Sequence, residues 1–74
     1  MPTPDEILVT VLDARVRYWH QWGIEIAYAT EDRAKIMRVI KRHRKNPFAL
    51  ATKAEALILK IEAPLRKQIG GNNA

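Results

Sequence analysis

The chain has 74 residues, of which 47% are hydrophobic, and it carries a formal net charge of +5 and no cysteine. This length fits one small domain, the hydrophobic share argues against intrinsic disorder, and the lack of cysteine excludes disulfide bonds and cysteine-based zinc sites. A chain this small buries little apolar surface by itself, so we expect it to form a homodimer.

Neither a secretory signal nor a membrane helix is expected. The first eight residues, MPTPDEIL, are acidic and lack the positive start and the cleavage site of a signal peptide. The longest apolar run, residues 7–12, is interrupted by Thr10 and is far too short to span a bilayer. These features predict a cytoplasmic protein that has no membrane partner.

Residues 3–22 are predicted to form the first helix. Thr3 is a suitable N-cap, Pro4 fits the first helical position, and Glu6 completes a capping box. Gly23 is the expected C-terminal stop. The competing interpretation is a strand, because the first half of this segment is rich in β-branched residues and the second half alternates between polar and apolar residues.

Apolar residues cover well over half of this helix, so it is expected to contact both its own domain and a symmetry mate. Arg15 lies near the centre of the apolar arc. One interpretation is an exposed edge, or an arginine stem that lies over Trp19 with the guanidinium in water. The other is a paired arginine at a dimer or partner interface, with Glu55 or Glu62 as its carboxylate. Arg15, Trp19 and Trp22 are therefore the candidate partner-interface residues.

The second helix is predicted over residues 30–45. Thr30 is the expected cap, and the two acidic residues after it lie at the positive end of the helix dipole. The helix should end before Pro47, because the residue that precedes a proline is steered away from helical geometry. Residues 24–29 stay unassigned between an extended link and a helical turn.

A third helix is predicted over residues 47–63, with a kink or restart at Pro64, because proline lacks the N–H needed to continue the ladder and its ring collides with the preceding turn. Its core face has three- and four-residue spacing. The face comprises Leu50, Ala54, Leu57, Ile58, Ile61 and Leu65. The sequence thus predicts an all-α, compact three-helix domain over residues 1–69, followed by a flexible tail at 70–74.

The second helix holds the strongest functional signal. Residues 33–45 contain seven of the thirteen Lys and Arg side chains and no acidic residue. At about 100° per residue, five of these cations share one face, opposite the apolar residues of the same helix. They are Lys35, Arg38, Lys41, Arg42 and Lys45. Like charges at this spacing repel one another, so the face is expected to bind phosphates of DNA or RNA; the alternative is a solvated basic face.

No catalytic or metal-binding constellation is found in the sequence. His20 and His43 have no cysteine or histidine companions at ligand spacing, and no nucleotide-binding loop or Ser-His pair occurs. We therefore expect neither enzyme activity nor a metal or cofactor. A standard helix-turn-helix is disfavoured as well, because the third helix offers mainly Leu, Ile and Ala where base-reading side chains are needed.

These features predict a small, basic, regulatory or accessory protein that binds nucleic acid through its second helix. The alternative is a protein-protein interaction module or inhibitor. Such a module would bind an acidic partner protein through the apolar face of the first helix, and the same positive charges would steer the encounter.

Overall fold

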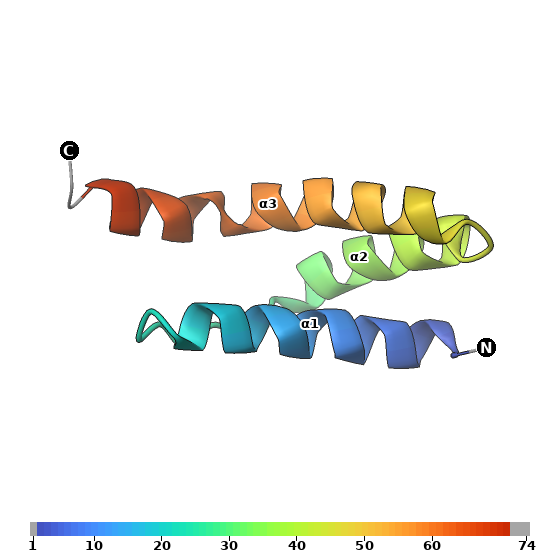
Figure 1. The fold of residues 1–74 in the computed structure, drawn as a ribbon, viewed down its shortest axis with the longest axis horizontal. Coiled ribbons are helices and arrows are strands. Elements are labelled where there is room, and N and C mark those ends of the chain that lie inside the picture. Colours follow the sequence, from blue (N-terminus) through green and yellow to red (C-terminus); the bar gives the residue numbers. More distant parts are fainter. Residues whose placement is uncertain (1, 72–74) are drawn as a thin grey trace.

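The computed structural model describes residues 2–71, and the side chains of residues 2–68. It contains three helices: α1 (Pro4–His20), α2 (Thr30–His43) and α3 (Pro47–Gly71). The predicted all-α, three-helix architecture is confirmed, and the strand interpretation of the first segment is wrong. Figure 1 shows that α2 runs antiparallel to α1 and α3, so that these two outer helices point in the same direction.

The start of α1 follows the predicted capping pattern. The hydroxyl of Thr3 accepts a hydrogen bond from the backbone N–H of Glu6 at 3.2 Å and donates one to the Glu6 carboxylate at 3.2 Å. Pro4 occupies the first turn, where its missing N–H leaves no partner unsatisfied. Local sequence therefore determines where this helix begins.

The end of α1 comes two residues earlier than predicted, but Gly23 has the expected role. Gly23 has a φ of 75°, a left-handed conformation that glycine adopts without strain. Its N–H donates to the carbonyl of His20 at 2.9 Å, and the N–H of Ile24 donates to Trp19 at 3.1 Å. These are the two hydrogen bonds of a Schellman motif, which satisfies the last carbonyls of the helix.

Residues 24–29 form neither helix nor strand and connect α1 to α2. The cap of α2 differs from the prediction, because Ala29 is the N-cap and Thr30 is the first helical residue. Ala29 offers no side-chain oxygen, so α2 begins without a side-chain cap. Its first turn depends on the acidic residues Glu31 and Asp32 to complement the helix dipole.

The connection between α2 and α3 is a tight turn. The second helix ends at His43, two residues before the predicted end. The side chain of Asn46 accepts a hydrogen bond from the backbone N–H of Ala49 at 3.2 Å, and Pro47 opens the third helix. Asn46 is thus the cap of α3, a role that the sequence prediction did not assign to it.

The predicted end of the third helix at residue 63 is wrong, because the helix continues through Pro64 to Gly71. It keeps about the same direction beyond the proline, where a kink or restart was expected (Figure 1). Arg66, just after Pro64, is hydrogen-bonded within the helix to Glu62 at 3.2 Å, and its guanidinium lies 5.6 Å from the ring centroid of Trp19 in α1. The contact with Trp19 holds the turns after the proline against α1, which offsets the cost of a proline inside the helix. Of the predicted tail, Gly70 and Gly71 are helical, and residues 72–74 lie outside the described residues.

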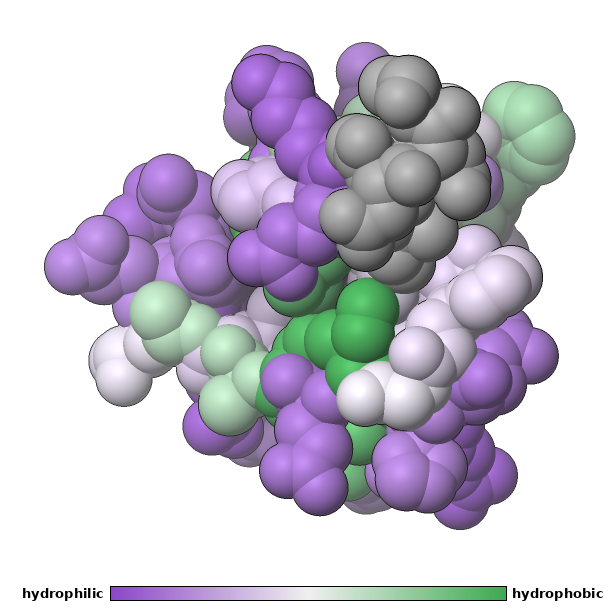
Figure 2. Space-filling model, turned by 90° about the vertical axis from the view of Figure 1, so that its left-hand side faces the viewer, coloured by the Kyte–Doolittle hydropathy of each residue, from purple (hydrophilic) through white to green (hydrophobic). Residues whose placement is uncertain are grey.

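The core lies where α2 packs against both outer helices. Its buried centre consists of one leucine and three isoleucines: Leu8, Ile36, Ile40 and Ile58. On the end of the molecule that Figure 2 shows, the most hydrophobic residues lie near the centre of the face, and mostly hydrophilic residues lie around them. Full burial of an isoleucine side chain stabilises a fold by about 1.5–3 kcal/mol. Ile36 and Ile40 have no exposed area, so both contribute strongly to the stability of the domain.

The outer helices are held apart by α2. Within the described residues, no Cα atom of α1 lies within 8 Å of one in α3, whereas both helices pack on α2. The molecule measures 42 × 21 × 18 Å and has a radius of gyration of 13.2 Å. The predicted compact three-helix domain is confirmed, and because a typical domain of this length has a radius of gyration of about 11 Å, this one is longer than usual in one direction.

Candidate nucleic-acid interface

The five predicted nucleic-acid-binding residues form one exposed surface on α2 and the turn after it, called the cationic face below. Lys35, Arg38, Lys41, Arg42 and Lys45 make up this surface, and all five are exposed. Successive helical residues are rotated by about 100° around the helix axis. On this projection, the buried Ile36 and Ile40 lie about 180° from the average direction of the five cations. Packing of the apolar side therefore directs the charges into solvent.

No acidic residue neutralises the cationic face in the described part of the chain. The ion pairs there join Arg15 to Glu62, Arg66 to Glu62 and Arg17 to Asp13, and none includes a residue of α2. The acidic residues of α2 itself, Glu31 and Asp32, lie in its first turn. Five unpaired cations on adjacent turns repel one another, and a bound anion would relieve that repulsion.

Two further arginines lie near the ends of this helix. Arg33 and Arg44 are both exposed, and Arg33 lines a shallow depression formed by α1 and the link. Arg44 follows the last residue of α2 and lies in the turn next to Lys45. They add positive potential at both ends of the cationic face.

Arg15 lies in a different site, where it pairs with Glu62 of α3. Its Nε and one terminal nitrogen donate to the two carboxylate oxygens at 2.9 and 2.5 Å. Glu62 is 1% exposed, and the Arg15 side chain is 25% exposed. The predicted pairing with Glu62 is found, but both residues belong to one chain, so this contact does not need a dimer or a partner.

Two more side chains complete this buried ion cluster. The hydroxyl of Tyr28 donates to the Glu62 carboxylate at 2.7 Å, and Arg66 donates at 3.2 Å. The Arg66 guanidinium also lies 5.6 Å from the ring centroid of Trp19, and that of Arg15 lies 4.4 Å from the Tyr18 ring. One carboxylate thus connects α1, the link between α1 and α2, and α3.

The cluster shifts the ionisation of its members. Burial alone would raise the pKa of Glu62, but the hydrogen bonds from Arg15 and Tyr28 hold this pKa below its usual value. The hydrogen bond with Glu62 raises the pKa of Arg15. Burial and the nearby carboxylate raise the pKa of the Tyr28 phenol. The charged form of Glu62 and the neutral form of Tyr28 are therefore both favoured at neutral pH.

The predicted partner-interface residues are separated by the fold. Trp19 is 1% exposed and packs edge to face with Tyr18 at a centroid distance of 5.4 Å, so it is a core residue. Its indole N–H lies near Glu62 and helps to lower the Glu62 pKa, but it has no hydrogen-bond partner within the described residues. Trp22, in the turn after α1, is exposed.

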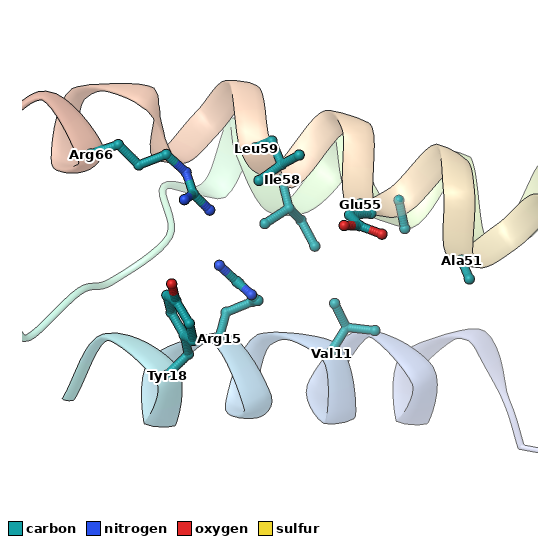
Figure 3. Close-up of a pocket in the computed structure, with 9 residues that line it drawn as sticks. Val11, Arg15, Tyr18, Ala51, Glu55, Ile58, Leu59 and Arg66 are labelled. Carbon is teal, nitrogen blue, oxygen red and sulfur yellow. The ribbon is translucent and has the colours of Figure 1, made fainter. Parts of the chain in front are cut away.

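A groove of ≈ 300 Å³ separates α1 from α3, and we call it the α1–α3 groove. Figure 3 shows Val11 and Ile58 directed into it and the guanidinium groups of Arg15 and Arg66 directed toward each other across it. Leu59 and Tyr18 also line it and remain partly exposed. Arg15 is predicted from the sequence as an interface residue, but the groove itself has no sequence signal. It depends on how far apart α2 holds its two neighbours.

Comparison with protein-family models, with curated proteins and with solved structures finds no match for this chain. Within residues 2–71, no helix is long and apolar enough to cross a membrane. In the same part of the chain, no three His, Asp or Glu side chains are grouped so that they could hold a metal ion.

Proposed function

We propose that this protein binds nucleic acid through the cationic face, mainly by contacting phosphates, and that it acts as a small regulatory or accessory factor without catalytic activity. The observation that carries the proposal is that five exposed cations on one side of α2 have no acidic partner in the described part of the chain. Phosphates supply the missing negative charge, and release of their counterions drives binding.

The dimensions of the cationic face support this proposal. At a rise of about 1.5 Å per residue, Lys35 and Arg42, the first and last members of the face within α2, lie about 10 Å apart along the helix axis, and Lys45 extends the face into the turn. The helical part corresponds to about three nucleotides of one strand at about 3.4 Å each. Simultaneous contacts with several neighbouring phosphates are therefore sterically reasonable.

The chemistry of the face favours binding with little sequence preference. Arginine and lysine contact phosphates of any sequence, whereas adenine is read best by asparagine or glutamine, and the face contains neither. Both DNA and RNA present suitable phosphates. The proposed ligand is therefore DNA or RNA, and the face recognises its charge and shape.

Titration of fluorescently labelled duplex DNA and RNA at 50 and 200 mM salt tests the proposal. Wild type is compared with the triple variant Arg38→Ala, Lys41→Ala, Arg42→Ala. The matched control is Lys53→Ala, Lys60→Ala, Lys67→Ala, which removes the same charge from exposed positions of α3. Helical content measured by circular dichroism ensures that all three proteins are folded.

Wild-type affinity is expected to fall with salt at a logarithmic slope of roughly −4, and the α2 variant to reduce that slope by about 2 to 3. The α3 variant should retain most of the affinity. Equal losses in the two variants would show that only net charge matters and would contradict a specific role for α2. No binding by wild type at low salt would exclude the proposal.

The alternative, an acidic partner protein that binds α1, has narrower support. Val9 and Val16 on α1 and Trp22 in the turn after it are exposed, but Trp19 is buried in the chain's own core. An interface on α1 would therefore use its outer side. Binding of an acidic protein that is lost in Val9→Lys but kept in the α2 triple variant would favour this alternative.

The proposal includes a homodimer and a cytoplasmic location. The elongated shape supports self-association, because much of the chain's apolar surface is not covered by the chain itself.

A further inference from the structure

The α1–α3 groove has an apolar lining that the chain leaves partly uncovered. Ile58 and Ala54 line it but are buried in the core, so the apolar area that stays open comes from Val11, Ala51, Tyr18 and Leu59. The small side chains of Ala51 and Ala54 leave room between the helices. Leu59, on the α3 side, is 42% exposed. In a bundle of four helices, this position opposite α2 would be filled by another helix.

The accessible surface of the chain is larger than expected for a folded monomer of its mass. Its accessible surface is 5681 Å². A folded monomer of 8.5 kDa is expected to expose about 4,700 Å², which leaves an excess of about 1,000 Å². A stable interface buries about 800 Å² on each partner, so the excess of the whole chain, of which the groove is one part, is large enough for one interface that extends beyond the groove onto α1 and α3.

The charges of the groove are compatible with a second copy of the same chain. Arg15 and Arg66 are balanced there by Glu62 and by Glu55, whose exposed carboxylate has no ion-pair partner in the described part of the chain. Two such neutral surfaces do not repel each other. By contrast, two cationic faces would repel each other strongly, so α2 cannot mediate self-association.

We infer that two copies of the chain dimerise by packing their α1–α3 grooves against each other, with the same residues of each copy in the interface. This inference rests on the proposed homodimer and is independent of nucleic-acid binding. A two-fold axis through the middle of the groove passes near Leu59, because the α3 wall extends from Ala51 to Arg66. The two copies of Leu59 then pack close together.

This dimer leaves both cationic faces accessible. In each chain, the cationic face points away from the core, and the groove opens on the opposite side of the core, between α1 and α3. Groove-to-groove packing therefore places the two cationic faces on opposite sides of the dimer. One dimer can then bind two separate nucleic-acid segments.

Light scattering after size-exclusion chromatography, without nucleic acid and from 1 to 200 μM protein, tests the inference. Wild type is expected to show twice the 8.5 kDa mass of the chain. Leu59→Lys should weaken association by roughly 100-fold or more, because the buried charge enters a symmetric interface twice. The matched control, Phe48→Lys, changes an 82% exposed residue outside the groove and should remain dimeric.

A second measurement does not depend on the folding of the lysine variant. Because the chain contains no cysteine, Leu59→Cys introduces a single thiol, and a short bismaleimide should join two copies covalently. Phe48→Cys should give little covalent dimer under the same conditions. A monomeric wild type at 200 μM, or cross-linking that is stronger for Phe48→Cys, overturns the inference.

The two proposals fail separately. The variant Arg38→Ala, Lys41→Ala, Arg42→Ala should keep the dimeric mass while it loses affinity for nucleic acid. If wild type is dimeric but does not bind nucleic acid, only the proposed function is wrong. If wild type binds nucleic acid as a monomer, the homodimer is wrong in both proposals and the proposed nucleic-acid binding stands.

Discussion

Arg15 and Glu62 lie 47 residues apart in the sequence and form a doubly hydrogen-bonded ion pair between two helices whose backbones do not pack directly. Arg15, one member of the pair, lines the α1–α3 groove between Val11 and Tyr18 (Figure 3). It is the longest-range side-chain hydrogen bond in the described part of the chain. The relative position of α1 and α3 therefore depends on this contact as well as on α2.

Arg15→Met should lower the free energy of unfolding by about 2–3 kcal/mol, because it leaves the Glu62 carboxylate buried without its main partner. This value is smaller than that of a fully buried pair, because the Arg15 side chain is partly exposed to water. Urea unfolding followed by circular dichroism measures the change. Arg17→Met, which removes an exposed pair with Asp13, should cost no more than about 0.5 kcal/mol. Equal effects of the two substitutions would contradict a structural role for the buried pair.

Tyr28→Phe should destabilise the fold by about 1.5–2 kcal/mol, because the Glu62 carboxylate loses a hydrogen bond from the phenol while the ring still packs. Thermal and urea unfolding provide the measurement. Tyr18→Phe is the control, since the Tyr18 hydroxyl makes no hydrogen bond to another described residue, and its effect should be near zero. A neutral Tyr28→Phe would mean that water replaces the lost donor.

The buried ion cluster predicts a pH dependence of stability. The folded-state pKa of Glu62 lies below its usual 4.5, so its stabilising contribution is complete above that pH and is lost as the pH falls through the folded-state value. The pKa of Tyr28 lies above its usual 10.0, so its contribution is complete below pH 10 and is lost at more alkaline pH. Urea unfolding at pH 3, 4.5 and 7 should show a smaller acid-induced loss in Glu62→Gln than in wild type.

Ala29→Asp should stabilise the protein by about 1 kcal/mol, because it supplies the side-chain cap that α2 lacks and places a negative charge at the positive end of the helix. The backbone of Ala29 already has the extended conformation that a capping residue needs, with φ −63° and ψ 154°. A rise in the urea midpoint with an unchanged slope would confirm the effect. Thr3→Ala, which removes the existing cap of α1, should lower stability by a similar amount.

Pro64→Ala should raise the free energy of unfolding by about 1–3 kcal/mol, because a proline inside a helix removes a backbone hydrogen bond and crowds the preceding turn. Pro47→Ala is the matched control. Pro47 opens α3, where proline is well tolerated, so its replacement should bring no gain. A destabilised Pro64→Ala protein would show that the geometry at the proline is needed to place Arg66.

The sequence was sufficient to predict elements whose signals are local. The cap of α1, the glycine stop at Gly23 and the separation of charges from apolar residues on α2 each depend on neighbours within a few positions. The same information placed the five cations on one exposed surface. The predicted helix ends are less accurate. Local preference favours Thr30 as the cap of α2, but the N-cap is Ala29. Asn46 caps α3, although the sequence prediction assigns it no such role.

Features that depend on tertiary contacts were not predictable to the same degree. Helix α3 passes through Pro64, and the contact that joins its last turns to another helix is that of the Arg66 guanidinium with the Trp19 ring of α1. The sequence indicates Glu62 as one of two candidate carboxylates for Arg15, but its burial and its hydrogen bond with Tyr28 depend on how the three helices pack. The spacing between α1 and α3 was likewise invisible in the sequence.

The middle helix has two separate constraints on its sequence. Its inner positions must remain apolar because both neighbours pack on them, and the proposed function requires its outer positions to remain cationic. Few residues of α2 are therefore free to vary during evolution. Related chains should diverge mostly along the outward sides of the first and third helices, and in the link between α1 and α2 everywhere except at Tyr28.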